Sequence, residues 1–261
     1  MKRKNICLLM LGLFATLSVT SCDDNNDGQN YVICPAVEPF NALVTVKPNA
    51  DNTSVYLQLD DQTTVFPSNM GKSPFGTKEV RALAVIKTTN DRTEGYDRTA
   101  LVYRLDSIRT KGMAADLGAD NAKTYGTDPV EIMKDWLTIV EDGYLTLRFR
   151  TNWGGQKVHT INLVATNPDK PYELTLYHSN NGDAQNYAAD GLVAFSLASL
   201  PDTDGKTVDL TLKWNAFGGE KTATFKYCSR KATGTLHINT VNPSSLTTGT
   251  MAGCLTPNKF D

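Results

Sequence analysis

Alternating apolar and polar residues recur through most of this 261-residue chain, and they restrict its fold more than any other feature. In residues 208–214, for example, four apolar side chains alternate with Asp209, Thr211 and Lys213. Successive side chains of a β-strand point to opposite faces, so this pattern indicates strands with one buried face. Because Gly, Asn, Asp and Pro separate these runs, we expect an all-β protein.

The first half of the chain predicts a small barrel or curled sheet of about five strands. A hairpin is expected around residues 60–62, since apolar alternation precedes this turn and Val65 continues it. Residues 110–128 are rich in Gly, Ala and Asp and break the pattern, which indicates a boundary between modules. We therefore expect an OB-like barrel over residues 38–115 and a linker over residues 116–127. The four longer strands are expected at residues 42–47, 54–59, 80–87 and 99–109.

The second half contains a clear hairpin signal, an Asp-Gly dipeptide at residues 142–143. This dipeptide tolerates the positive φ angles of a two-residue type I′ turn. Such a turn fixes a register in which Val140 faces Leu145 and, further along, Trp136 faces Phe149. The apolar residues of the hairpin then share one face, and the polar residues that alternate with them share the other.

A second hairpin is expected from two alternating runs, residues 157–165 and 172–178, which flank a turn containing two prolines. If this hairpin is symmetric, His159 faces His178 across the two strands. Further strands are expected at residues 192–197, 207–215 and 221–228. About seven strands over residues 128–230 predict an immunoglobulin-like β-sandwich.

The N-terminus has the pattern of a signal peptide. Lys2, Arg3 and Lys4 precede an apolar run at residues 6–14. This run is shorter than the ~20 apolar residues that a membrane-spanning helix needs. We therefore expect a cleaved signal over residues 1–21.

The signal ends in Val-Thr-Ser-Cys at residues 19–22, which resembles a lipobox. We expect Cys22 to be acylated and to anchor the protein in the membrane; a chance Cys near an ordinary cleavage site is the alternative. Residues 22–37 are expected to form a flexible acidic tether. Its acidic start resembles the surface-export signal of Bacteroidetes lipoproteins, although a plain solvated linker would look the same. We therefore expect a lipid-anchored, surface-exposed protein of the outer membrane.

The mature chain is mildly acidic, because loss of the signal removes three of 26 basic residues and none of 28 acidic ones. No basic stripe occurs in the sequence, so we expect no nucleic-acid partner. Cys7 leaves with the signal and Cys22 is used for lipidation. At most one disulfide can then form within the chain, and which two of Cys34, Cys228 and Cys254 pair stays open.

Several segments resemble the NigD-like lipoproteins of Bacteroidetes. They are the lipobox, DGYLTLRF at residues 142–149, HTINLV at 159–164, LTLYHSN at 174–180 and VAFSL at 193–197. The resemblance implies an OB-like N-terminal domain and a C-terminal β-sandwich, with bacteriocin immunity as one suggested role. It is good over residues 128–227 and loose elsewhere. Residues 231–261 lie outside it; we expect an edge strand and a loose tail there, of open role.

His159 and His178 are the sharpest candidates for local chemistry. Two facing imidazoles can hold a metal ion or titrate as a coupled pair. Zinc needs at least a third ligand, however, and no HxH or HExxH spacing supplies one. We therefore expect a half-buried, hydrogen-bonded pair and no metal or other cofactor.

Trp153 and Phe217 are candidate ligand contacts, because each stands directly before a Gly-Gly pair in a segment expected to connect strands. Aromatic side chains in such loops can stack on sugars. The alternative is that each ring folds back and covers the edge of the sandwich.

The sequence carries no catalytic motif of the GxSxG, GxGxxG or P-loop kind. Acidic pairs occur at residues 60–61, 141–142 and 202–204, but all coincide with turns, where Asp is favoured for backbone reasons. We therefore predict that the chain is not an enzyme but a protein-interaction or structural module. A glycan-binding accessory lipoprotein is the alternative, and an envelope hydrolase is the least favoured. The partner and the oligomeric state stay open.

Overall fold

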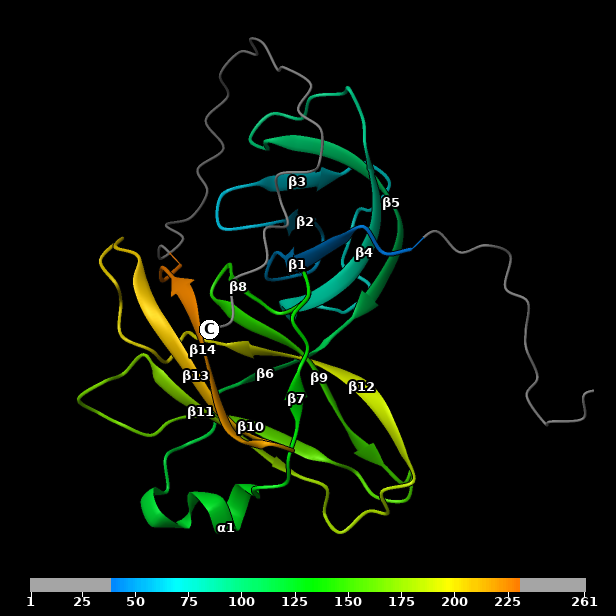
Figure 1. Cartoon of the computed structure of the whole chain (residues 1–261). Coiled ribbons are helices and arrows are strands. Elements are labelled where there is room, and N and C mark those ends of the chain that lie inside the picture. The colour runs from blue at the N-terminus through cyan, green and yellow to red at the C-terminus, as the bar shows by residue number, and fades with distance from the viewer. Residues whose placement is uncertain (1–38, 231–261) are drawn as a thin grey trace, which may run out of the picture. The chain divides into compact units, whose positions relative to one another are not determined.

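The computed structural model describes residues 39–230, and the regular secondary structure of this part of the chain is almost entirely β-strand (Figure 1). The expected signal peptide, lipidated Cys22, tether and C-terminal strand lie outside the described residues, as do Cys34 and Cys254. Within residues 39–230, no helix has the length and apolar character needed to cross a membrane.

The first five strands close into a barrel in the order β1-β2-β3-β5-β4 (Figure 1). They are β1 (Ala42–Pro48), β2 (Val55–Gln58), β3 (Thr64–Pro67), β4 (Val80–Thr88) and β5 (Arg98–Ser107). The expected hairpin around residues 60–62 joins β2 to β3, where Leu57 pairs with Val65. Both residues are buried in the barrel interior together with Val44 and Val46 of β1, so the alternating pattern is explained by a packed barrel core.

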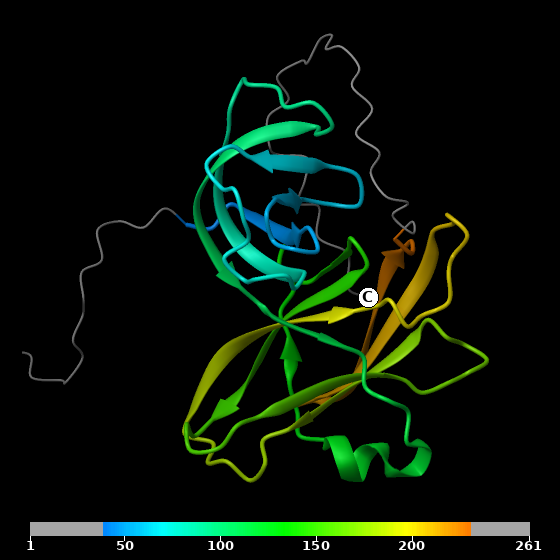
Figure 2. The same cartoon turned by 180° about the vertical axis from the view of Figure 1, so that it is seen from behind.

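The remaining strands form a two-sheet sandwich, which Figure 2 shows from behind. They are β6 (Arg109–Gly112), β7 (Glu131–Ile132), β8 (Ile139–Glu141), β9 (Tyr144–Trp153), β10 (Thr160–Ala165), β11 (Glu173–Ser179), β12 (Tyr187–Ser196), β13 (Val208–Ala216) and β14 (Gly219–Tyr227). One sheet has the order β10-β11-β13-β14, and the other has the order β6-β12-β9-β7 with β8 paired to β9. The all-β prediction of an OB-like barrel followed by a sandwich is confirmed.

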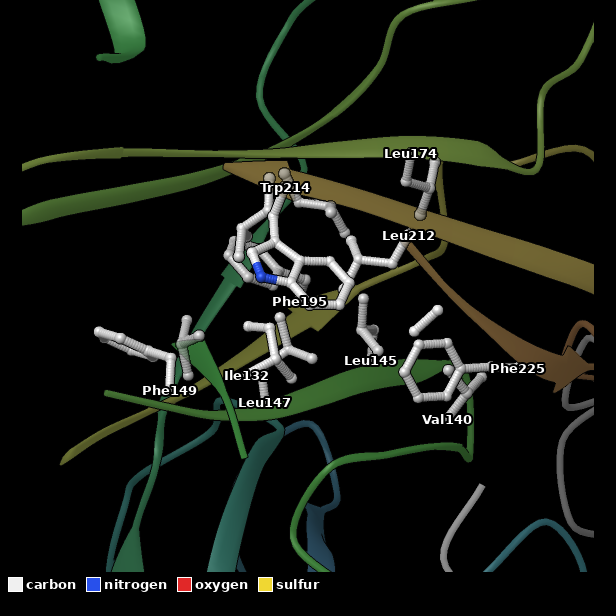
Figure 3. Packing of buried hydrophobic residues seen from close by; sticks show 14 of the residues in the cluster. Ile132, Val140, Leu145, Leu147, Phe149, Leu174, Phe195, Leu212, Trp214 and Phe225 are labelled. Atoms are coloured by element: carbon white, nitrogen blue, oxygen red, sulfur yellow. The ribbon is translucent and has the colours of Figure 1, made fainter. Parts of the chain in front are cut away.

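Apolar side chains from both sheets fill the sandwich interior (Figure 3). Leu145 and Leu147 reach inward from β9, and Leu212 and Trp214 do so from the facing β13. None of these four is more than 4% exposed. The polar residues that alternate with them in β13 are the partly or fully exposed ones, as the sequence pattern predicts.

The boundary between the modules lies earlier than the sequence indicated. Strand β6 follows β5 almost directly and pairs in parallel with β12, so the sandwich begins at Arg109. Residues 116–127 are not a bare linker, because they hold the short helices η1 (Gly118–Asp120) and α1 (Asn121–Tyr125). The ring of Tyr125 lies 6.0 Å from that of Tyr177 on β11. Strand β6 was missed because it is four residues long and mostly polar, so it shows no apolar alternation.

The predicted turn at residues 142–143 is confirmed. Asp142 and Gly143 have φ angles of 47° and 71°, as a type I′ turn requires. Val140 pairs with Leu145, so the register next to the turn is also as predicted.

Further from the turn the predicted register is wrong, because Phe149 pairs with Ile132 of β7 and not with Trp136. The ladder between β8 and β9 stops before that point. There the Thr138 hydroxyl accepts a hydrogen bond from the backbone amide of Arg148 at 3.2 Å. A side chain thus replaces the backbone pairing, and a second short strand takes over further along β9.

The β10–β11 hairpin is also shifted from its predicted register, by two residues. Ile161, and not His159, pairs with His178. The connecting loop is asymmetric, since it makes its own backbone turns, from Lys170 to Asn167 and from Glu173 to Lys170. A shift of two residues keeps every side chain on its predicted face.

Candidate functional site

The two histidines meet at the end of the hairpin where strand β10 begins and strand β11 ends. His159 immediately precedes β10, and its Nδ1 atom lies 3.0 Å from Nε2 of His178. On the other side of its ring, His178 Nδ1 lies 3.2 Å from the backbone carbonyl of Asp128. The structure therefore brings together the pair that the sequence singled out, through a diagonal contact instead of a direct cross-strand one.

The direction of these hydrogen bonds follows from the partners. A carbonyl oxygen only accepts, so His178 donates from Nδ1 to Asp128, and its Nε2 is left to accept from His159. Burial lowers the pKa of His178, and the hydrogen bond to Asp128 only partly offsets this effect. His178 is thus held as a neutral imidazole at neutral pH.

Asp183 completes this group, and nothing in the sequence pointed to it. Its carboxylate accepts hydrogen bonds from four consecutive backbone amides, those of residues 154–157, at distances of 2.7 to 3.2 Å. The same carboxylate lies 3.4 Å from Nε2 of His159, and its side chain has no exposed surface. Asp183 therefore fixes the loop that leaves β9 to the loop that enters β12.

The hydrogen bonds around Asp183 also set its charge. Burial alone would raise its pKa, but bonds from the backbone amides of Gly154, Gln156 and Gly155 and from His159 outweigh burial and lower the pKa to about 2. The carboxylate is thus ionised at any physiological pH. Among residues 39–230 no three His, Cys, Asp or Glu side chains converge in the manner of a metal site, so the pair lacks a third ligand there.

Trp153 was expected in a loop, but it is the last residue of strand β9. Its indole ring stacks on His159 with centroids 4.0 Å apart, and its Nε1 donates to the carbonyl of Ala189 at 2.9 Å. Trp153 is partly buried against the sandwich core. Phe217 lies in the turn between β13 and β14, where half of its surface is exposed.

One exposed aromatic residue beside this group was missed by sequence reasoning. Tyr187 begins β12, pairs with Trp153 in the sheet, and is 55% exposed. Next to it, the Asn152 amide donates to the Gln185 side chain at 3.3 Å. Tyr187 follows a polar loop and begins a run without apolar alternation, so its sequence context gave no signal.

At the opposite end of β9, the acidic turn at residues 141–142 is buried. Glu141 accepts a hydrogen bond from the Arg81 guanidinium of β4 at 2.5 Å, and Arg81 is fully buried. Thr45 and Thr146 accept further hydrogen bonds from the same guanidinium. Burial raises the pKa of Glu141 to about 7, although the Arg81 charge opposes the rise.

Asp142 is held by charged groups as well. Its carboxylate pairs with Lys47 of β1 at 2.8 Å and with Arg230 at 3.0 Å. Its backbone amide donates to the Asp61 carboxylate at 2.6 Å, and burial raises the pKa of Asp61. These contacts join the barrel strands to the β8–β9 turn.

Asp60 and Asp202 each stabilise their own turn, as expected of acidic residues there, whereas Asp61 contacts the Asp142 turn. Asp60 accepts a hydrogen bond from the amide of Gln62 at 2.8 Å, and Asp202 accepts one from the amide of Asp204 at 3.0 Å. Within residues 39–230 Cys228 has no disulfide partner, and its sulfur accepts a hydrogen bond from Thr203 at 3.6 Å. Which two of Cys34, Cys228 and Cys254 pair stays open, because Cys34 and Cys254 lie outside the described residues.

Comparisons with known families match both modules. Residues 43–108 match the NigD-like N-terminal OB domain, and residues 112–227 match the NigD-like C-terminal beta sandwich domain. No curated protein sequence matches the chain.

Solved structures of proteins from Parabacteroides and Bacteroides species share the architecture. A protein of Parabacteroides distasonis that is designated toxin-related is 37% identical, with a TM-score of 0.61, over 72% of this chain and 92% of that one. A protein of unknown function from Bacteroides vulgatus is 22% identical, with a TM-score of 0.60, over 77% and 95% of the two chains. A NigD-like immunity protein of Bacteroides caccae is 21% identical, with a TM-score of 0.53, over 72% and 96%. The last two similarities are evidence for the fold alone.

Proposed function

The chain belongs to the NigD-like family, and from that premise we propose that it is a non-catalytic, lipid-anchored protein-interaction or structural module of the cell envelope. The observation that carries this proposal is the match of both modules, residues 43–108 and 112–227, to the two NigD-like domains.

The side-chain chemistry supports a role without catalysis. A general base or nucleophile needs a reactive partner within reach of a substrate. Instead, one ring nitrogen of His178 hydrogen-bonds to a backbone carbonyl, and both carboxylate oxygens of Asp183 accept hydrogen bonds from backbone amides. Glu141 is turned inward to Arg81. The side chains whose pKa values are shifted therefore stabilise the fold through internal hydrogen bonds and ion pairs.

The anchor is tested with Cys22→Ala, which should release the protein from the outer membrane without altering its fold. Cell fractionation and detergent partitioning measure the release, and protease treatment of intact cells measures surface exposure. Cys34→Ala is the matched control, because it removes a thiol of the mature chain and leaves the lipobox intact. Retention of the Cys22→Ala variant at the outer membrane would disprove the anchor.

Bacteriocin immunity is the specific interaction that we propose to test first. A 37% identical relative is designated toxin-related, and a protein with the same fold is designated an immunity protein. Cells that lack this protein should be killed by a toxin of a neighbouring strain, and a crosslinked toxin should co-purify with the wild-type protein. Equal survival of both strains against all such toxins would count against immunity.

A glycan-binding accessory lipoprotein is the second candidate function. The half-exposed ring of Phe217 favours it, whereas Trp153 is engaged with His159 and Ala189 and offers less free surface. Phe217→Ala and Trp153→Ala should each weaken binding on a polysaccharide array. Unchanged binding by both variants would remove these two residues from any glycan site.

A further inference from the structure

His159 and His178 take part in three hydrogen bonds, and each of the three needs a proton on an imidazole nitrogen. At one end, Nδ1 of His178 faces the carbonyl oxygen of Asp128, which only accepts. At the other end, Nε2 of His159 lies 3.4 Å from Oδ2 of Asp183, a carboxylate that is ionised because its pKa is lowered to about 2. The third proton lies between the two rings, where Nδ1 of His159 and Nε2 of His178 are 3.0 Å apart.

Two neutral imidazoles carry only two N–H groups between them, so they cannot make all three of these hydrogen bonds. With two protons, one of the three contacts would set two acceptor atoms against each other inside the protein, which is costly. The side chain of His159 is only 3% exposed, so its partners have to come from the protein and not from water. A third proton satisfies every contact and gives the pair of histidines one positive charge.

The surroundings of the two rings place this charge on His159. Its ring contacts the ionised carboxylate of Asp183, whereas burial lowers the pKa of His178 and favours the neutral form of that residue. The indole of Trp153 stacks on His159, with 4.0 Å between the ring centroids and an angle of 20° between the ring planes. The face of an aromatic ring attracts a cation, and most strongly where the cation is removed from water.

The other charged groups nearby are engaged elsewhere. The Asp128 carboxylate accepts a hydrogen bond from a backbone amide at 2.8 Å. Lys157 belongs to the loop that precedes His159, but its ammonium lies over Gly182, where a Cβ atom would be 3.3 Å from Nζ. The charges of His159 and Asp183 therefore balance each other, and hydrogen bonds satisfy the remaining donors and acceptors of both groups. A buried ion pair is tolerated under these conditions.

The same ion pair fixes a loop. Residues 154–158 are attached to Asp183 through four of their backbone amides, and the Asn181 side chain donates to the carbonyl of Val158 at 2.5 Å. The ring of His159 follows directly in the chain and contacts the same carboxylate. If His159 loses its second proton, it can donate to only one of its two partners, and the other contact then sets two acceptors against each other. The loop loses one of its attachments.

We propose that His159 is a buried imidazolium whose second proton acts as a latch: the latch holds the loop of residues 154–158 to Asp183 up to neutral pH and releases it as the pH rises further. Free histidine loses this proton at about pH 6.5, so the latch stays closed in a range where an unpaired histidine is neutral. This pH-sensitive contact is independent of the lipid anchor, of immunity and of glycan binding.

The proton count is measured directly by ¹⁵N NMR of the imidazole nitrogens in the complete mature protein in detergent. His159→Gln and His178→Gln assign the signals, because each variant removes one ring. At about pH 7 we expect hydrogen on both ring nitrogens of His159 and on Nδ1 alone of His178. A nitrogen of His159 without hydrogen at this pH overturns the proposal, and this measurement on the wild-type protein does not depend on the folding of any variant.

The effect on the loop is measured by amide hydrogen exchange at residues 154–157. His159→Gln keeps a side-chain donor but cannot carry the charge, so these amides should exchange roughly tenfold faster or more than in wild type at about pH 7. The difference should vanish at the higher pH where wild-type His159 gives up its second proton. Lys157→Gln is the matched control, because it removes an exposed positive charge from the same loop and should leave exchange unchanged. Equal exchange in His159→Gln and wild type at about pH 7 would show that the charge does not hold the loop, and the latch would be wrong.

Discussion

Strand β9 has a buried carboxylate near each of its ends, and the two are stabilised in different ways. Beside its first residue, Glu141 meets the charged guanidinium of Arg81. Near its last residue, Asp183 meets four uncharged backbone amides and His159. The consequences for ionisation are opposite, since the pKa of Glu141 is raised to about 7 and that of Asp183 is lowered to about 2.

The difference reflects the depth of burial as well as the partners, since residues 155–157, which cover Asp183, are themselves exposed, whereas Arg81 beside Glu141 is fully buried. One guanidinium, itself buried and shared with two threonine hydroxyls, does not fully compensate Glu141 for the loss of water. Several backbone dipoles in fixed positions do compensate Asp183. The contacts of Glu141 join the barrel to the sandwich. The contacts of Asp183 instead hold loops that remain accessible to solvent.

Removal of Arg81 should have the largest effect on this comparison. Arg81→Met leaves Glu141 buried without its cation, so the free energy of unfolding at about pH 8 should fall by about 3 to 5 kcal/mol. Urea denaturation measures the loss. Arg104→Met is the control, because its ion pair with Asp106 is exposed and should contribute less than about 1 kcal/mol.

The loss should also depend on pH. The folded pKa of Glu141 lies above its ordinary value of 4.5, so the folded protein takes up a proton more readily than the unfolded chain. The contribution of Glu141 protonation to the free energy of unfolding is fully present below pH 4.5 and is lost as the pH rises through 7. At about pH 5 Glu141 is neutral, and the penalty of Arg81→Met should shrink markedly. An equal penalty at both pH values would show that Glu141 stays ionised throughout.

Neutralising Asp183 should have the next largest effect. An Asn side chain has one oxygen instead of two, so Asp183→Asn leaves some of the four amides of residues 154–157 without an acceptor. We expect Tm at neutral pH to fall by roughly 3 to 8 °C. Asp209→Asn is the control, because Asp209 has an exposed ion pair with Lys226.

The pH dependence at this end has the opposite sign. Because the folded pKa of Asp183 is depressed from 3.8 to about 2, its contribution is present above 3.8 and is lost as the pH falls through 2. The difference in Tm between wild type and Asp183→Asn should therefore be constant at neutral pH and narrow in strong acid. A difference that already narrows near pH 6 would mean that the histidines, and not Asp183, control the loop.

The sequence predicted what depends on local periodicity and turn chemistry. The type I′ turn followed from an Asp-Gly pair, and the contact between His159 and His178 survived a wrong register because a two-residue shift keeps the faces. The position of Trp153 was misjudged because the Gly-Gly pair after it resembles the middle of a loop, whereas the strand runs up to the tryptophan itself.

The roles of Asp183 and Glu141 could not be predicted, for physical reasons. The partners of Asp183 are backbone amides almost 30 positions away, and a backbone amide leaves no trace in the sequence. Glu141 looked like a turn residue, and the polar face of its hairpin looked solvent-exposed. That face is buried near the turn, since Tyr144 is 6% exposed and Thr146 is not exposed, because the barrel covers it.

Two neighbouring glycines test the backbone of the Asp183-bound loop. A Cβ at Gly154 would lie 2.6 Å from the carbonyl oxygen of Ala184, so Gly154→Ala forces the two loops apart. Gly155 has a φ angle of 76°, and a Cβ there would make only an ordinary contact with the Tyr187 hydroxyl at 3.7 Å, so Gly155→Ala should cost only the left-handed backbone, about 1 to 2 kcal/mol. We expect Gly154→Ala to lower Tm more than Gly155→Ala and to speed amide hydrogen exchange at residues 154–157, which hydrogen-exchange mass spectrometry would measure. If Gly155→Ala lowered Tm more than Gly154→Ala, the backbone conformation, and not the close approach to Ala184, would be what holds this loop. The contrast with the ion-paired end of β9 would then rest on Asp183 alone.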